Sequence, residues 1–173
     1  MRKIEPAKTS DHKGLTRQVQ DFWTRNVNAE RVQGKVVAVS PRGEDSYFAE
    51  LEQQRYRSHR HLLPWVTSMQ PGRSVIEIGC GVGLDSFVIA NNGLNLTAVD
   101  LTKVAVETAQ GRFHRKGIAG RFSLSDACNL PFGDDVFDYV YSFGVLHGGQ
   151  YAQKPWRGAQ GAEAWWRSAD HAL

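Results

Sequence analysis

The sequence predicts an α/β domain with a parallel, doubly wound sheet, and two observations predict this fold class. From residue 71 onward, short runs rich in β-branched and aromatic residues alternate with helical segments, the pattern of repeated right-handed β-α-β units. A glycine-rich turn joins the first of these runs, residues 74–78, directly to a helix. The chain has 173 residues, of which 41% are hydrophobic, and this suffices for one core.

Residues 1–70 are predicted to be helical. Four apolar residues recur there at helical spacing on one face: Leu15, Val19, Phe22 and Trp23. Ser46 is expected to cap a second helix, and Pro64 to mark its end. These helices are expected to form a lid over the sheet.

Beyond residue 70, four strands are predicted: residues 74–78, 96–100, 121–126 and 137–142. The helix after the first strand should begin near Leu84. The helix after the second should start at Thr102, which can cap it, and end at Gly117, a residue suited to a C-terminal exit.

The composition argues against several classes of protein. No apolar run reaches the roughly 18 residues of a membrane span, and the basic start lacks the apolar stretch of a secretory signal. Cys80 and Cys128 are too few for a disulfide framework or a four-ligand zinc site, and no metal-binding constellation is expected. The net charge is +3, with the basic excess in residues 1–70 interleaved with acidic residues, so we expect no nucleic-acid partner. A cytoplasmic location follows as the expectation, whereas the oligomeric state does not follow from the sequence.

The turn after the first strand has the pattern Glu77-x-Gly79-x-Gly81-x-Gly83. Glycines let the backbone turn sharply and let a ligand approach closely, and the helix start offers unpaired N–H groups. A dinucleotide fingerprint would place its third glycine at position 84, which is Leu84. A nicotinamide-dependent oxidoreductase therefore remains only as an alternative.

The segment VIEIGCGVGLDS resembles the first motif of class I S-adenosylmethionine-dependent methyltransferases, and the similarity continues to FDYVYSFGVLH. The stretch LPFGDDVFD is especially similar to the type 11 group, which includes the ubiquinone and menaquinone biosynthesis enzymes. The resemblance covers about residues 71–147 and is specific for the cofactor rather than the substrate. It implies a Rossmann-like fold, S-adenosylmethionine as cofactor and in-line methyl transfer to a small-molecule acceptor.

The resemblance also implies roles for the residues of the first motif. Gly79, Gly81 and Gly83, with Cys80 between them, would form the floor under the methionine portion and the ribose. Glu77 would hold the amino end of the cofactor, directly or through water.

Further residues gain roles from the same resemblance at the ends of the later strands. Asp100 would accept hydrogen bonds from the two ribose hydroxyls, and Leu101 would cover one face of the adenine. Asp126 would accept from the adenine amino group, with the Ala127 N–H near a ring nitrogen. The end of the fourth strand would line the cofactor with Ser142, Phe143 and Gly144.

Each of these positions has a structural alternative. Asp100 and Asp126 suit strand ends and turn caps, and Glu77 suits a paired buried carboxylate. Cys80 suits packing better than nucleophilic chemistry. No general base is evident; His147, at the end of the fourth strand, is the best candidate, and a structural role serves it equally well.

The methyl acceptor is not specified by the sequence. Aromatic residues of the N-terminal helices could line an acceptor pocket or simply pack in the core: Phe22, Trp23, Tyr47, Phe48 and Tyr56. His59 and His61 flank Arg60 and are expected to be solvated.

The tail from residue 148 differs in composition from the rest of the chain. It lacks Val, Ile, Phe and Met and holds three of the five tryptophans, so a fifth strand is not expected there. Read from the second base of each codon, residues 160–166 are compatible with R-V-L-K-P-G-G, which precedes strand five in the family, so the tail is interpreted as frame-shifted. The chain then divides into a lid (1–70), a cofactor-binding core (71–147) and a non-native tail (148–173). Its sheet would stop after the fourth of the family's seven strands, and a fragment that binds cofactor without turnover is the second alternative.

Overall fold

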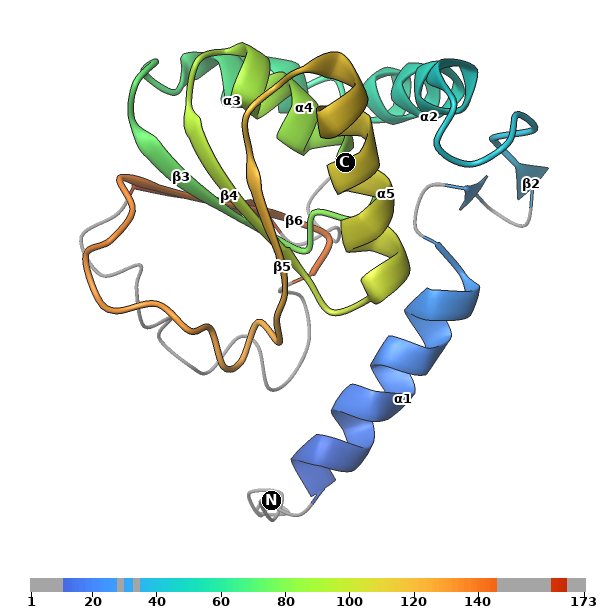
Figure 1. Cartoon of the computed structure of the whole chain (residues 1–173), viewed down its shortest axis with the longest axis horizontal. Helices are drawn as coiled ribbons and strands as arrows, with labels where there is room; N and C mark the ends of the chain where they lie inside the picture. The colour runs from blue at the N-terminus through green and yellow to red at the C-terminus, as the bar shows by residue number, and fades with distance from the viewer. Residues whose placement is uncertain (1–10, 28–29, 33–34, 146–162, 168–173) are drawn as a thin grey trace, which may run out of the picture.

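The computed structural model describes residues 11–27, 30–32, 35–145 and 163–167 (Figure 1). Its centre is a parallel sheet with the strand order β5-β4-β3-β6-β7. The strands are β3 (Ser74–Ile78), β4 (Asn95–Asp100), β5 (Arg121–Leu124), β6 (Tyr139–Phe143) and β7 (Glu163–Arg167). The direction of winding reverses between β3 and β6, which is the doubly wound topology. The predicted fold class is confirmed.

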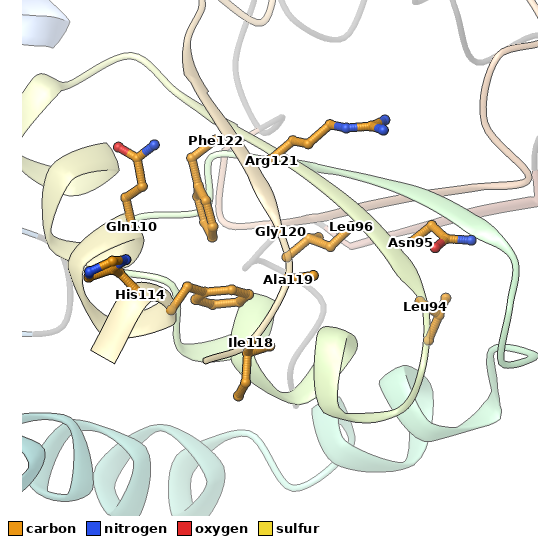
Figure 2. A pocket seen from close by; sticks show the side chains of 11 residues that line it. Leu94, Asn95, Leu96, Gln110, His114, Ile118, Ala119, Gly120, Arg121 and Phe122 are labelled. Carbon is orange, nitrogen blue, oxygen red and sulfur yellow. The ribbon is translucent and has the colours of Figure 1, made fainter. Parts of the chain in front are cut away.

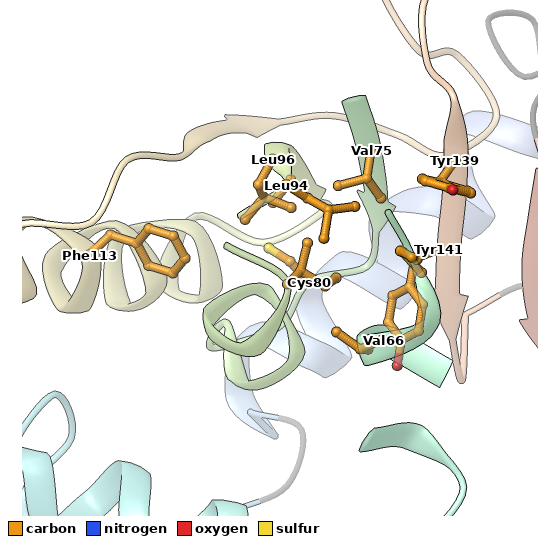
Figure 3. Packing of buried hydrophobic residues seen from close by; sticks show 11 residues of the cluster. Val66, Val75, Cys80, Leu94, Leu96, Phe113, Tyr139 and Tyr141 are labelled. Carbon is orange, nitrogen blue, oxygen red and sulfur yellow. The ribbon is translucent and has the colours of Figure 1, made fainter. Parts of the chain in front are cut away.

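Three helices line one face of the sheet: α3 (Leu62–Ser68), α4 (Leu84–Asn91) and α5 (Lys103–Lys116) (Figure 1). The core on this face joins Val75 and Leu96 of the strands to Ile89 and Phe113 of the helices (Figure 3). Because side chains alternate along a strand, Ile76 and its neighbours face the other way. That second face is covered, within the described residues, by the segment 125–138, which contributes Leu130, Phe132 and Phe137.

The N-terminal part contains α1 (Asp11–Arg25), a two-stranded antiparallel ribbon of β1 (Arg31–Val32) and β2 (Lys35–Val36), and α2 (Asp45–Ser58). Helix α2 is anchored in the core, because Tyr47, Phe48 and Leu51 are buried against Val82 and Leu84. Helix α1 differs: it projects from the helical layer (Figure 1) and leaves large apolar side chains exposed. These side chains are Leu15 (45% exposed), Phe22 (54%) and Trp23 (41%).

The predicted helix from Ser46 to Pro64 is wrong at both ends. The helix begins at Asp45 with Glu44 as its N-cap, and it ends at Ser58. A second helix, α3, starts at Leu62 and holds Pro64 in its first turn. Proline is tolerated there because the first N–H groups of a helix have no intrahelical partner. Pro64 therefore marks a helix start.

The prediction that no fifth strand forms is also wrong. Residues Glu163–Arg167 pair in parallel with β6, so β6 is not an edge of the sheet. The segment lacks β-branched residues, but aromatic residues also favour strands, and the sequence of β7 is EAWWR. The sheet of the described residues still has five strands where the resemblance implies seven.

Candidate functional site

The predicted site residues gather at one edge of the sheet. In a parallel sheet the carboxyl ends of all strands meet at the same edge, and ligands bind there near the point where the strand order reverses. The glycine loop follows β3, Asp100 ends β4, Asp126 lies shortly after β5, and Phe143 ends β6.

The glycine loop is held by its neighbours on both sides. The N–H groups of Gly79 and Cys80 both donate to the carbonyl of Val99, at 2.8 and 3.0 Å. Gly79 has φ +76°, and a Cβ there would lie 2.0 Å from Cγ2 of Val145, so only glycine fits. Around Gly81, in contrast, an added Cβ would meet nothing within 4 Å. The crest of the loop therefore faces open space.

Asp100 ties the end of β4 to this loop. Its Oδ2 accepts the N–H of Gly81 at 2.9 Å, and its Oδ1 accepts both the N–H and the hydroxyl of Thr102, at 2.8 and 2.9 Å. A carboxylate has about four acceptor positions, so one remains on Oδ2. A diol would take that position and compete with the Thr102 hydroxyl for a second.

Asp126 is held mainly by its own turn. Its Oδ1 accepts the N–H of Cys128 at 2.9 Å. Helix α1 lies over this end of the sheet: Thr16 donates to Oδ2 of Asp126 at 3.5 Å, and Gln20 donates to the carbonyl of Leu101 at 2.8 Å. The N-terminal helix thus covers the two residues that the resemblance links to adenine.

Glu77 is buried in β3, with 3% of its surface exposed. Its Oε2 accepts the hydroxyl of Ser86 at the start of α4. Burial, and then the nearby charge of Asp85, raise the pKa of Glu77 to about 8, while Arg55 opposes this rise. Burial therefore favours the neutral form of Glu77, and a cation that came close would favour its ionised form.

A second buried carboxylate lies beside Glu77 and was missed by the sequence analysis. Asp85 of α4 forms a bidentate ion pair with Arg55 of α2, whose Nε donates to Oδ1 at 2.9 Å and whose Nη2 donates to Oδ2. Tyr56 donates to Oδ1 at 3.0 Å and Tyr141 of β6 to Oδ2 at 2.7 Å. Four donor bonds therefore hold one carboxylate.

The charge of Asp85 is fixed by this arrangement. Burial disfavours the ionised form, but Arg55 and the two tyrosine hydroxyls outweigh it and lower the pKa of Asp85. The sequence holds one signal of such a partner. Asp85 is the only charged residue of α4, LDSFVIAN, and a lone charge in an apolar helix indicates a buried ion pair.

The residues predicted at the end of β6 have different surroundings. Phe143 lines the same small pocket as Arg55, Glu77 and Asp85, with the Arg55 guanidinium 4.8 Å from its ring centroid. The Ser142 hydroxyl donates to the carbonyl of Ile78 at 3.0 Å, which joins β6 to β3. Gly144 has a left-handed backbone, with φ +78°.

The other candidates separate into packing and surface residues. Tyr47 and Phe48 are core residues, whereas Phe22 and Trp23 are exposed. His59 and His61 are half-buried rather than solvated, and both rings pack against Phe143, at centroid distances of 4.9 and 6.0 Å. They are half-buried because the turn between α2 and α3 brings both histidines over the end of β6.

The remaining candidates are described by their surroundings. Burial raises the pKa of the Cys80 thiol, which disfavours the reactive thiolate, and Ala127 packs against the core of the second face. His147 lies outside the described residues. Within those residues, no group of three or more His, Cys, Asp or Glu could hold a metal ion, and no helix has the length and apolar character that a membrane crossing needs.

A larger pocket, of about 710 Å³, lies at the opposite edge of the sheet (Figure 2). It is formed by the amino ends of β4 and β5 and the last turns of α5. Its lining includes Phe113 and Phe122 with His114 and Arg121, and none of the described residues in it is a carboxylate. The residues of the carboxyl edge do not reach it, so it is separate from the candidate site.

Known proteins match this chain through the same region. Residues 75–159 match a family described as a methyltransferase domain. An O-methyltransferase, cnsE, of Penicillium expansum is 35% identical over 78 residues, which are 43% of this chain and 28% of that protein. The 2-methyl-6-phytyl-1,4-hydroquinone methyltransferase of Synechocystis sp. is 26% identical over 125 residues, 70% of this chain and 39% of that protein. The chain thus spans well under half the length of these relatives.

Solved structures match in fold. The PH0226 protein of Pyrococcus horikoshii OT3 superposes with a TM-score of 0.51 and 25% identity, over 62% of this chain and 50% of that protein.

Proposed function

We propose that this chain, which belongs to the class I methyltransferase family, binds S-adenosylmethionine and serves methyl transfer to a small-molecule acceptor. The observation that carries the proposal is the convergence of Glu77, the glycine loop, Asp100 and Asp126 on one edge of the sheet. Glu77 lies near the end of β3 and the glycine loop follows that strand, whereas Asp100 ends β4 and Asp126 comes after β5. All four thus belong to the carboxyl edge of the sheet, where ligands of this fold bind.

The residues fit the proposed cofactor in two halves. The amino-acid half consists of Arg55, Glu77 and Asp85, around a pocket rich in charge. The nucleoside half consists of Asp100, Leu101 and Asp126. In the nucleoside half, Asp100 has an acceptor position left for a ribose hydroxyl, and the Gly81 crest faces open space. In the amino-acid half, Glu77 is a carboxyl group whose ionisation a bound ammonium would favour.

The protein's contribution to the reaction is mainly placement. S-adenosylmethionine supplies a methyl group that its sulfonium already activates, so in-line positioning of the acceptor provides much of the acceleration. The glycine loop and Asp100 hold one side of the cofactor in this proposal, and α1 covers the nucleoside half. A proton acceptor is needed only for acceptors that lose a proton.

A small-molecule acceptor is supported by the names of the matched relatives, an O-methyltransferase and a hydroquinone methyltransferase. The exposed apolar residues of α1, Phe22 and Trp23, lie on the helix that covers the nucleoside half and are available to an apolar acceptor.

The proposal is tested by titration calorimetry. The chain should bind S-adenosylhomocysteine and should not bind NAD⁺ or NADP⁺, because Leu84 occupies the place of the third glycine of a dinucleotide fingerprint. Binding of a nicotinamide cofactor without S-adenosylhomocysteine would favour the oxidoreductase and refute the proposal.

A further inference from the structure

We propose that Arg55, on helix α2 of the N-terminal part, recognises the carboxylate of the cofactor's amino-acid end and makes the site selective for ligands that carry it. This inference rests on the proposed function and adds a residue to it. The family match begins at residue 75, so Arg55 lies outside the region that it covers.

Position is the first argument. Arg55 lines the same small pocket as Glu77, Gly79, Gly81 and Phe143. It belongs to helix α2 and precedes Glu77 by 22 positions in the chain. Among the described residues that line this pocket, it is the only Lys or Arg. A ligand that ends in the pocket with both an ammonium and a carboxylate therefore finds Glu77 for the first charge and Arg55 for the second.

The bonding of Arg55 is the second argument. Its Nε and Nη2 are committed to Asp85, and its guanidinium lies over the Phe143 ring. Among the described residues, no hydrogen bond involves Nη1. A guanidinium has five N–H donors in a rigid fork, so the group can hold Asp85 with one side and offer donors from Nη1 to a ligand.

Electrostatics is the third argument. Asp85 compensates Arg55, and this makes a buried cation tolerable before any ligand binds. The acidic residues of the described lining, Glu77 and Asp85, offer no cationic donor to the negative end of an amino acid. A carboxylate next to Arg55 would gain a charge-assisted hydrogen bond, which is stronger than a bond between neutral groups.

The preorganisation of Arg55 is the fourth argument. Asp85 holds its guanidinium through two hydrogen bonds, and Tyr56 and Tyr141 hold Asp85 in turn, so little side-chain freedom remains to be lost on binding. A flexible surface lysine would have to be ordered by the ligand. These hydrogen bonds thus position the Arg55 cation. An experiment on Arg55 must therefore distinguish ligand recognition from a contribution to folding.

The test compares three ligands: S-adenosylhomocysteine, its decarboxylated analogue, which keeps the ammonium, and 5′-methylthioadenosine, which lacks the whole amino-acid end. The variant is the double substitution Arg55→Gln with Asp85→Asn, which removes both charges together and keeps hydrogen-bonding groups for Tyr56 and Tyr141. Arg57→Gln is the matched control, because Arg57 is exposed on the same helix.

The wild type and the Arg57 control should bind S-adenosylhomocysteine about tenfold or more tightly than the decarboxylated analogue, on the scale of a hydrogen bond between charged groups. In the double variant this preference should disappear, while the affinity for methylthioadenosine changes less than about twofold.

An unchanged preference in the double variant would overturn the inference and leave the proposed function intact. If the double variant bound none of the three ligands while the Arg57 control bound them normally, Arg55 would be needed for folding rather than for ligand recognition. That result would also overturn the inference. Failure of the wild type to bind any of the three would refute the proposed function itself, which is a distinguishable result.

Discussion

The amino-acid half of the candidate site and its nucleoside half hold their carboxylates in different ways. Asp85 and Glu77 are buried, and their bonds come from side chains of α2, α4 and β6. Asp100 and Asp126 are half-buried, and most of their bonds come from N–H groups within their own strand-end turns or the glycine loop. The first half therefore depends on the whole tertiary structure, whereas the second is built largely from local sequence. Removing the Asp85 carboxylate should therefore act mainly on stability, whereas removing the Asp100 carboxylate should act mainly on ligand affinity.

The largest effect is expected for Asp85→Ala. This change leaves the Arg55 cation buried without its partner and should lower the free energy of unfolding by about 3–5 kcal/mol. Urea denaturation measures it. Adding Arg55→Met to Asp85→Ala should recover part of the lost free energy of unfolding, because the unpaired buried charge is then gone. A decrease of less than about 1 kcal/mol for Asp85→Ala would contradict the view that the amino-acid half depends on tertiary contacts.

The next effect concerns pH. The folded chain holds the pKa of Glu77 at about 8, above its ordinary 4.5, so between these values the folded state binds more protons than the unfolded state. Stability should therefore fall as the pH rises from about 5 to 8, with a Glu77 contribution of roughly 1 kcal/mol per pH unit. Urea denaturation of the wild type and Glu77→Gln at pH 5, 6.5 and 8 tests this: the variant should lose that part of the slope, and parallel curves would refute the assignment.

In the nucleoside half, Asp100→Ala should act on binding. The change removes an acceptor for ribose hydroxyls, and we expect an affinity for S-adenosylhomocysteine lower by about tenfold or more, as for a hydrogen bond to a charged group. Calorimetry measures the affinity, and far-ultraviolet circular dichroism checks the fold. Equal affinities in variant and wild type would remove Asp100 from the site.

The smallest effect is expected at Gln20, which joins α1 to the carbonyl of Leu101. Gln20→Ala should weaken the attachment of α1 by about 0.5–1.5 kcal/mol and leave the sheet unchanged. Amide hydrogen exchange should then become faster in α1 and remain the same in β3 and β4. Gln18→Ala, at an exposed position of the same helix, serves as the control; equal acceleration in both variants would show that the Gln20 bond has no special role.

The same contrast explains what the sequence could predict. Strand β3 runs directly into the glycine loop, and Asp100 and Asp126 come at or just after strand ends, so local patterns placed all of them at one edge. The bounds of α5, with Thr102 before it and Gly117 after it, were predicted for the same reason.

The features that the sequence did not predict involve either contacts between distant segments or residues with competing secondary-structure preferences. Arg55 meets Asp85 across 30 positions of the chain, and no spacing rule links an arginine of one helix to an aspartate of another. At the break between α2 and α3, His59 and His61 pack against Phe143, which lies more than 80 positions later in the sequence at the end of β6. In strand β7 two preferences compete: the segment lacks β-branched residues, which disfavours a strand, but its two tryptophans favour one, and it pairs with β6.

The attachment of α1 has a kinetic consequence. Its side-chain bonds to the edge of the sheet in the described structure are those of Thr16 and Gln20, whereas the glycine loop beneath is bonded by its backbone to Val99 and Asp100. In the proposed function, exchange of the ligand would then need a swing of α1 that breaks only these side-chain bonds, while the glycine loop stays folded. Turnover limited by such a swing would slow as solvent viscosity rises, and the chemical step would not.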